Sequence, residues 1–203
     1  FYFFYWWFYC SIFFFFFCFQ AEDGIRYLVL SRGLGDVYKG KQHGLEDDCY
    51  VEMLDYKIYL FENQGLGSEY YGFHNNNHEL EVTYVSLLAI NQEKIQFTEE
   101  DKKYLYVAAL FPDFDPQKNV DKPHEKSVLE FILKDKKLRQ FMADAKIDLE
   151  IIKVLILRTT YPWSGDIRKE AEKEIKKCFE TSELTKNDQQ LQQHIMEIGW
   201  YLS

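Results

Sequence analysis

Two histidines and two aspartates are the residues of this sequence whose types and spacing favour chemistry. His74 and His78 flank three asparagines, directly before a run with helical periodicity. Asp113 and Asp115 follow another such run, on either side of Phe114. Imidazole and carboxylate groups that converge from separate helix ends form divalent-metal sites in helical proteins. The spacing therefore predicts a metal site between helix ends.

The position of the two aspartates strengthens this prediction. Pro112 disfavours a helical conformation at Phe111, so the helix that opens at Thr98 should end at about residue 111. The carbonyl groups at a helix C-terminus are partially negative, so two carboxylates just beyond it are costly without a cation. The alternative interpretation is a solvated turn, with the histidines as ordinary polar loop residues.

The elements that must position these residues are all predicted to be helices. Periodic apolar residues and capping signals predict helices over 46–63, 79–90, 98–111, from about 121–125 onward, and over 136–145, 147–157, 166–181 and 188–202. Residues 69–78, which hold both histidines, are predicted as a loop. Residues 147–157 are apolar nearly all round, which indicates a buried central helix. No strand pattern is found in residues 40–203, so we predict an all-α bundle of about six to eight helices.

The first 39 residues differ from the rest of the chain. Phe1–Phe19 is long enough to cross a bilayer, but it lacks a basic leading region and contains no Leu, Val or Ala. Residues 20–26 resemble a translated sequencing primer, and residues 31–39 resemble a translated transposase adapter. We therefore interpret residues 1–39 as non-native and residues 40–203 as the domain. The alternative is a genuine membrane anchor.

The net charge limits the kinds of partner that we expect, and the cysteine spacing indicates the cellular compartment. The net charge is −9, and the three acidic and three basic residues of the first 39 positions cancel. An acidic domain argues against a broad nucleic-acid surface, but a metal-assisted phosphate ligand remains compatible with it. The four cysteines show no paired spacing, which favours free thiols in a reducing cytoplasm: Cys10, Cys18, Cys49 and Cys178.

The order of these motifs resembles that of the HD-domain metal-dependent phosphohydrolases, in particular their cyclic-nucleotide phosphodiesterase-like branch. The resemblance covers most of residues 50–203. It rests on His74-x-x-x-His78, on Asp113 after a hydrophobic helix, and on His124 at the start of the next helix. It implies an HD-type helical bundle that binds a divalent metal (Mn, Mg, Zn or Fe) and hydrolyses a small phosphoester or a nucleotide.

The resemblance also implies a role for each residue. His74 matches the proton donor to the leaving oxygen, His78 a metal-ligand histidine, and Asp113 the aspartate that bridges two metals. His124 matches a histidine that lines the site. Three further residues would contact metal-bound water or substrate: Asp115, Asp121 and Lys122. Metal-assisted hydrolysis with an imidazole acid is the chemistry of such a set.

Two departures weaken the predicted site. Pro112 stands where the family has the histidine of its His-Asp pair, and proline has no side-chain donor atom. The family's last metal-ligand aspartate would follow Ser203, so we expect a C-terminally truncated domain. Each missing ligand lowers metal affinity. We expect an impaired phosphohydrolase; the alternative is a non-catalytic helical domain that binds a nucleotide or a protein.

The remaining candidates have structural interpretations. Arg158 is predicted to satisfy carbonyl groups at its helix end, although a phosphate contact is an alternative. Tyr161 and Trp163 are predicted to pack in the core, and the alternative is that they line a pocket. His43 and His194 are predicted to be structural or surface residues.

Overall fold

The computed structural model describes residues 45, 48–63, 76–92, 97–112, 114 and 125–202. Within these residues the chain forms eight α-helices, one short 3-10 helix and no strand. The elements are α2 (Asp48–Asn63), α4 (Asn76–Gln92), α5 (Glu99–Ala109), α6 (Glu125–Lys134), α7 (Lys136–Asp144), α8 (Leu149–Arg158), α9 (Gly165–Thr181), α10 (Gln189–Ile198) and η2 (Gly199–Leu202). The prediction of an all-α helical bundle is confirmed.

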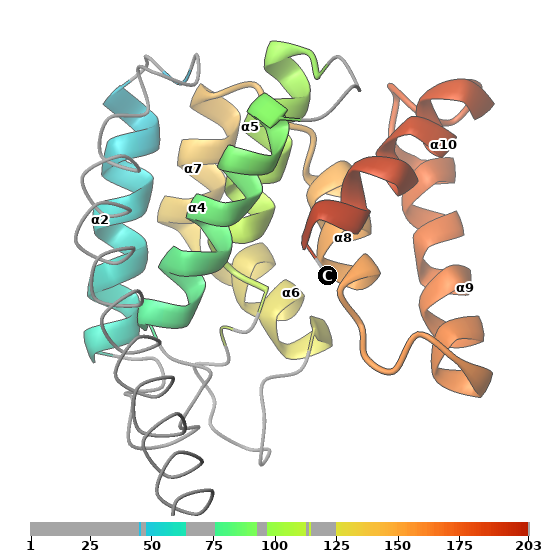
Figure 1. Ribbon diagram of the computed structural model, residues 1–203, viewed down its shortest axis with the longest axis horizontal. Coiled ribbons are helices and arrows are strands. Elements are labelled where there is room, and N and C mark those ends of the chain that lie inside the picture. Colours follow the sequence, from blue (N-terminus) through green and yellow to red (C-terminus); the bar gives the residue numbers. More distant parts are fainter. Residues whose placement is uncertain are drawn as a thin grey trace, which may run out of the picture.

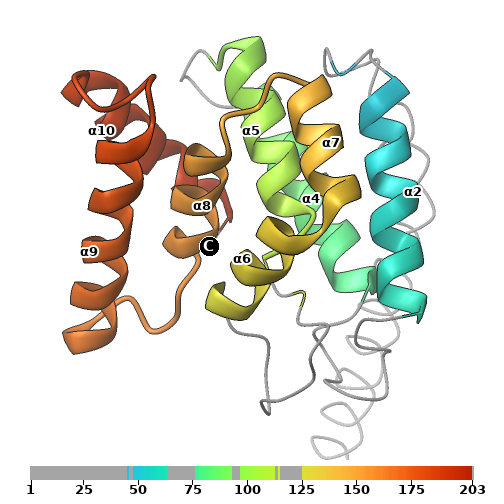
Figure 2. The ribbon, with the colours of Figure 1, turned by 180° about the vertical axis from the view of Figure 1, so that it is seen from behind.

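The helices lie in two groups with α8 between them (Figure 1). The helices α2, α4, α5 and α7 form one group, and α9 and α10 lie on the opposite side of α8, as the reverse view in Figure 2 also shows. The helix α8 packs against α5, α6, α9, α10 and η2. The core is therefore continuous across both groups.

The buried central helix predicted from the apolar run is α8. Asp148 caps it, because the Asp148 side chain accepts a hydrogen bond from the Glu150 backbone N–H. All its residues from Ile151 to Arg158 are buried except Lys153. Full burial of one large aliphatic side chain stabilises a fold by about 1.5–3 kcal/mol. A ten-residue helix of this composition is thus a main source of core stability.

Helix boundaries differ from the sequence prediction at one point that matters for the site. The helix α4 begins at Asn76 rather than at residue 79, so His78 lies in its first turn and not in a loop. Asparagine favours helix starts as well as loops, and Glu79 in the first turn complements the helix dipole. The prediction of a loop through His78 is therefore wrong.

The predicted start of α5 is confirmed in detail. The Asp101 backbone N–H donates to Thr98 Oγ1 at 3.1 Å, and the Thr98 N–H donates to Asp101 Oδ2 at 2.7 Å. This reciprocal capping box satisfies two backbone donors that the helix leaves without partners. The helix ends at Ala109, slightly before the predicted limit, because Pro112 prevents its continuation. The last predicted helix also ends earlier, at Ile198, and continues as the 3-10 helix η2.

In the part of the chain that the structure describes, no helix combines the length and the apolar character needed to cross a bilayer. Phe1–Phe19, for which a membrane anchor was the alternative interpretation, lies outside these residues.

Removal of side-chain volume from α8 should destabilise the fold strongly. Leu155 is fully buried on α8. We expect Leu155→Ala to lower the free energy of unfolding by about 2–5 kcal/mol, measured by urea denaturation. Lys173→Ala, an exposed change on α9, is the control and should shift it by less than about 0.5 kcal/mol. Equal effects of the two changes would show that α8 is not the centre of the core.

Candidate functional site

The first turn of α4 and the residues after α5 lie at the same end of the bundle (Figure 1). The two helices run antiparallel and pack together. Thr83 Oγ1 on α4 lies 3.0 Å from the Ala109 carbonyl oxygen and 2.8 Å from the Glu79 carbonyl oxygen. The hydroxyl proton is shared between these two carbonyl oxygens, and the contact with Ala109 joins the last residue of α5 to the first half of α4. This contact brings His78 and Pro112 to one end of the fold.

A cluster of phenylalanine rings holds the segment that follows α5. The Phe114 ring centroid lies 4.8 Å from that of Phe61 on α2 and 5.0 Å from that of Phe131 on α6. Phe111 packs edge-on against Phe114 at 6.5 Å. Pro112, which follows Phe111 in the sequence, is buried as well. Offset and edge-to-face rings of this kind stabilise by about 0.5–1.5 kcal/mol per pair beyond their burial. The chain after α5 is thus anchored to both α2 and α6.

A buried cation and a buried carboxylate connect α2 to the first turn of α4. Lys57 and Glu79 have no solvent-exposed surface. Lys57 Nζ also lies 4.4 Å from the centre of the Phe61 ring. Burial lowers the pKa of Lys57 to about 8, against the opposing attraction of Glu79. Glu79 directly follows His78, so the attraction between the buried Lys57 and Glu79 draws α2 towards the part of α4 that carries the histidine.

Only one of the predicted site residues lies within the part of the chain that the structure describes. His78 is half-buried in the first turn of α4. The others lie outside the described residues: His74, Asp113, Asp115, Asp121, Lys122 and His124, together with His43. The described residues hold no group of three or more His, Cys, Asp or Glu side chains that could bind a metal. With Pro112 lacking a donor atom, the described residues do not by themselves fit a complete metal site.

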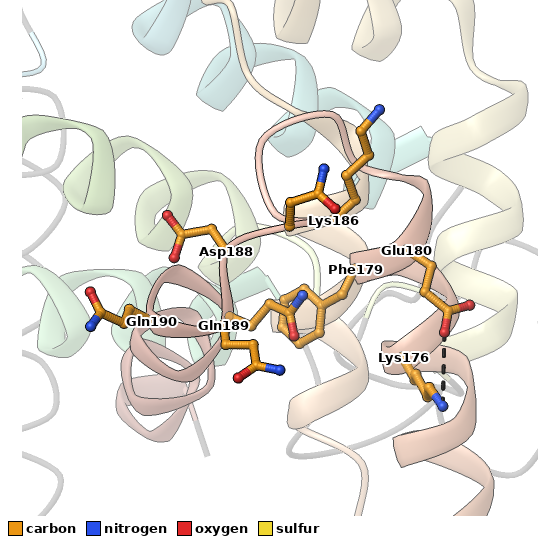
Figure 3. A pocket seen from close by; sticks show the side chains of 9 residues that line it. Lys176, Phe179, Glu180, Lys186, Asp188, Gln189 and Gln190 are labelled. Carbon is orange, nitrogen blue, oxygen red and sulfur yellow. Dashed lines mark ion pairs between the residues drawn. The ribbon is translucent and has the colours of Figure 1, made fainter.

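Two hollows lie elsewhere among the described residues. One, of about 270 Å³, is mostly apolar, and His194 Nε2 at its edge lies 3.1 Å from Asp101 Oδ2. Because Asp101 also caps α5, this contact ties α10 to α5. The other is an open, polar hollow of about 650 Å³ at the α9–α10 connection (Figure 3). There Lys176 pairs with Glu180 at 3.8 Å, and no set of groups converges on one point.

Sequence reasoning missed the burial of Lys57 and the surroundings of Arg158. Lys57 lies three and four residues from apolar positions on both sides, so helical periodicity alone places it on the buried face of α2. Arg158 was predicted to contact helix-end carbonyls. Instead its guanidinium stacks between Trp163 and Trp200, which is a tertiary contact without a local signal. Tyr161, predicted to pack in the core, is exposed.

Comparison of the chain with protein families, with curated proteins and with solved structures gives no match. The resemblance to HD-domain phosphohydrolases therefore rests on the sequence motifs.

Burial of Lys57 should make stability rise with pH above neutrality. The pKa of Lys57 is about 8 in the folded state against an ordinary value of 10.5. Between these values the unfolded state binds more protons, so the free energy of unfolding increases with pH. The penalty of the buried charge is fully present below the folded pKa and is relieved as pH rises through it. Lys57 alone can raise the free energy of unfolding by at most about 1.4 kcal/mol per pH unit.

The measurement is urea denaturation from about pH 7 to about pH 9.5, a window set by this pKa shift. The reference is a double variant, Lys57→Met with Glu79→Gln, which keeps similar volume and removes both charges. We expect the wild-type chain to gain stability relative to the reference across this window. Parallel pH profiles for the two proteins would refute a lowered pKa at Lys57.

Proposed function

We propose that this chain is an HD-type metal-dependent phosphohydrolase whose metal site is weakened by Pro112. The supporting observation is the contact of Thr83 with the Ala109 carbonyl oxygen. It brings the His78 turn and the segment after α5 to the same end of the bundle. A site assembled from these two helix ends is the arrangement that the motif order predicts.

The chain's own residues have separable tasks in this proposal. A divalent cation, when bound, would polarise the phosphoester and activate water. His78 would hold that cation from the first turn of α4. The N-terminal end of a helix carries a partial positive charge, which would favour an anionic phosphate near that turn. The attraction between the buried Lys57 and Glu79 and the phenylalanine cluster would keep the start of α4 and the end of α5 in place.

Pro112 accounts for the expected loss of activity. Its ring is buried and offers no nitrogen or oxygen to a metal. Loss of one ligand leaves the others without fixed geometry, and removal of even the groups that orient ligands costs about 10–100-fold in affinity. Weak metal binding and weak turnover follow.

Restoration of an imidazole at position 112 tests the proposal. We expect Pro112→His to bind Mn²⁺ at least about tenfold more tightly than the wild-type chain in calorimetric titration. It should also gain Mn²⁺-dependent hydrolysis of bis(p-nitrophenyl) phosphate. Pro112→Ala controls for the altered backbone and should gain neither property. Adding His78→Ala to Pro112→His should abolish both gains.

The proposal would be contradicted if a folded Pro112→His variant, checked by circular dichroism, bound Mn²⁺ no more tightly than the wild-type chain and showed no turnover. That result would favour a second candidate function, a non-catalytic domain that binds a nucleotide or a protein partner. The buried, donor-free Pro112 is the observation that supports this candidate. Nucleotide binding that is unchanged by EDTA would be its expected property.

A further inference from the structure

The guanidinium of Arg158 is held between two indole rings. Arg158 is the last residue of α8, and its guanidinium carbon lies 4.3 Å from the ring centre of Trp163 and 3.8 Å from that of Trp200. Trp163 comes from the α8–α9 connection and Trp200 from η2. Cation–π contacts of this kind are strongest when the cation is desolvated, and only 3% of Arg158 is exposed.

The backbone of η2 fixes the aliphatic part of the same side chain. A Cβ atom added to Gly199 would lie 2.7 Å from Arg158 Cγ and 3.1 Å from its Cβ. A glycine is therefore required for η2 to approach so closely. With two indole rings against it and its stem confined, the guanidinium is held in place in advance of any contact along its edge.

The edge of this guanidinium carries donors that the fold does not use. Arginine has five N–H donors and no acceptor. Within the described part of the chain, the contacts of the Arg158 guanidinium are the two indole faces, and no carboxylate or carbonyl oxygen accepts from its nitrogens. Among the described residues, no Arg158 nitrogen is a fully buried atom that lacks a partner, so this edge still reaches solvent. Burial of the rest of the side chain lowers the pKa of Arg158.

A second cation lies on the same indole. The Arg168 guanidinium carbon, from α9, lies 6.0 Å from the ring centre of Trp163. Its charge repels that of Arg158 and lowers the pKa of Arg158 further. Arg168 is half exposed, and its Nε donates to Glu172 Oε1 at 2.7 Å, which leaves its terminal nitrogens for another acceptor. Two like charges close to one ring make a bound anion favourable at this turn.

We propose that Arg158 and Arg168, with Trp163 and Trp200, form a binding site for a phosphate-type oxyanion at the α8–α9 turn. The planar fork of arginine matches the oxygens of a phosphate, and two cations favour a dianion over a single carboxylate. The site contains neither His78 nor Pro112, so it does not rest on the proposed phosphohydrolase function. The exposed ring of Trp200 would add stacking surface if the phosphate belongs to a nucleotide.

The test is titration of the full chain with inorganic phosphate and with AMP in EDTA at constant ionic strength. Tryptophan fluorescence reports on the indoles beside Arg158, and calorimetry gives the affinity. We expect saturable binding of phosphate, and weaker binding of acetate at the same ionic strength. Equal affinity for AMP and phosphate would assign the site to the phosphate group alone, and tighter AMP binding would assign it to a nucleotide.

Arg168→Gln is the decisive variant because the side chain is exposed and the fold does not depend on it. We expect it to weaken phosphate binding about tenfold, as the loss of one charge-assisted contact implies. Lys169→Gln is the matched control. It removes the same charge from the next residue, which is exposed and paired with Asp166 at 2.9 Å, and it should change affinity by less than about twofold.

Three outcomes would overturn the proposal: no saturable phosphate binding by the wild-type chain, equal losses in Arg168→Gln and Lys169→Gln, or wild-type affinity in a folded Arg158→Met variant. If Arg158→Met does not fold, the comparison of Arg168→Gln with Lys169→Gln decides whether the oxyanion site exists.

Discussion

Burial of α8 on nearly every side is the constraint on which the rest of the structure depends. A helix that is apolar nearly all round can be stable only when other elements cover its whole circumference. The helices α5, α6, α9 and α10 and the 3-10 helix η2 provide that cover. Its last residue, Arg158, emerges from this core directly into the stack of Trp163 and Trp200. The same helix therefore organises the core and positions a charged group at the core's edge.

Polar groups inside the bundle each connect two helices. Lys57 and Glu79 connect α2 with α4, Thr83 connects α4 with α5, and Asp101 with His194 connects α5 with α10. Buried polar groups are costly unless they have partners, so the contact of Thr83 with Ala109 and that of Asp101 with His194 also specify how their helices must sit. Register between α4 and α5 matters most for the candidate site, because it decides which residues share that end.

Pro112 shows how a helix end can keep its place while losing a chemical group. Proline still terminates α5, and the rings of Phe111 and Phe114 still anchor the following segment to α2 and α6. The backbone arrangement that a site at this position requires is thus separable from the donor atom that a metal requires. The packing of this segment does not need an imidazole at position 112, whereas coordination of a metal there does.

The sequence by itself determined the helical class, the capping box of Thr98 and Asp101, the end of α5 before Pro112 and the central burial of α8. These follow from local periodicity, capping and proline geometry, which act over a few residues. The start of α4 at Asn76 was missed because asparagine favours helix starts and loops alike. Only the tertiary structure decided the attraction between the buried Lys57 and Glu79 and the stacking of Arg158 on Trp163 and Trp200. The residues involved lie on different elements, and no local pattern specifies contacts between distant segments.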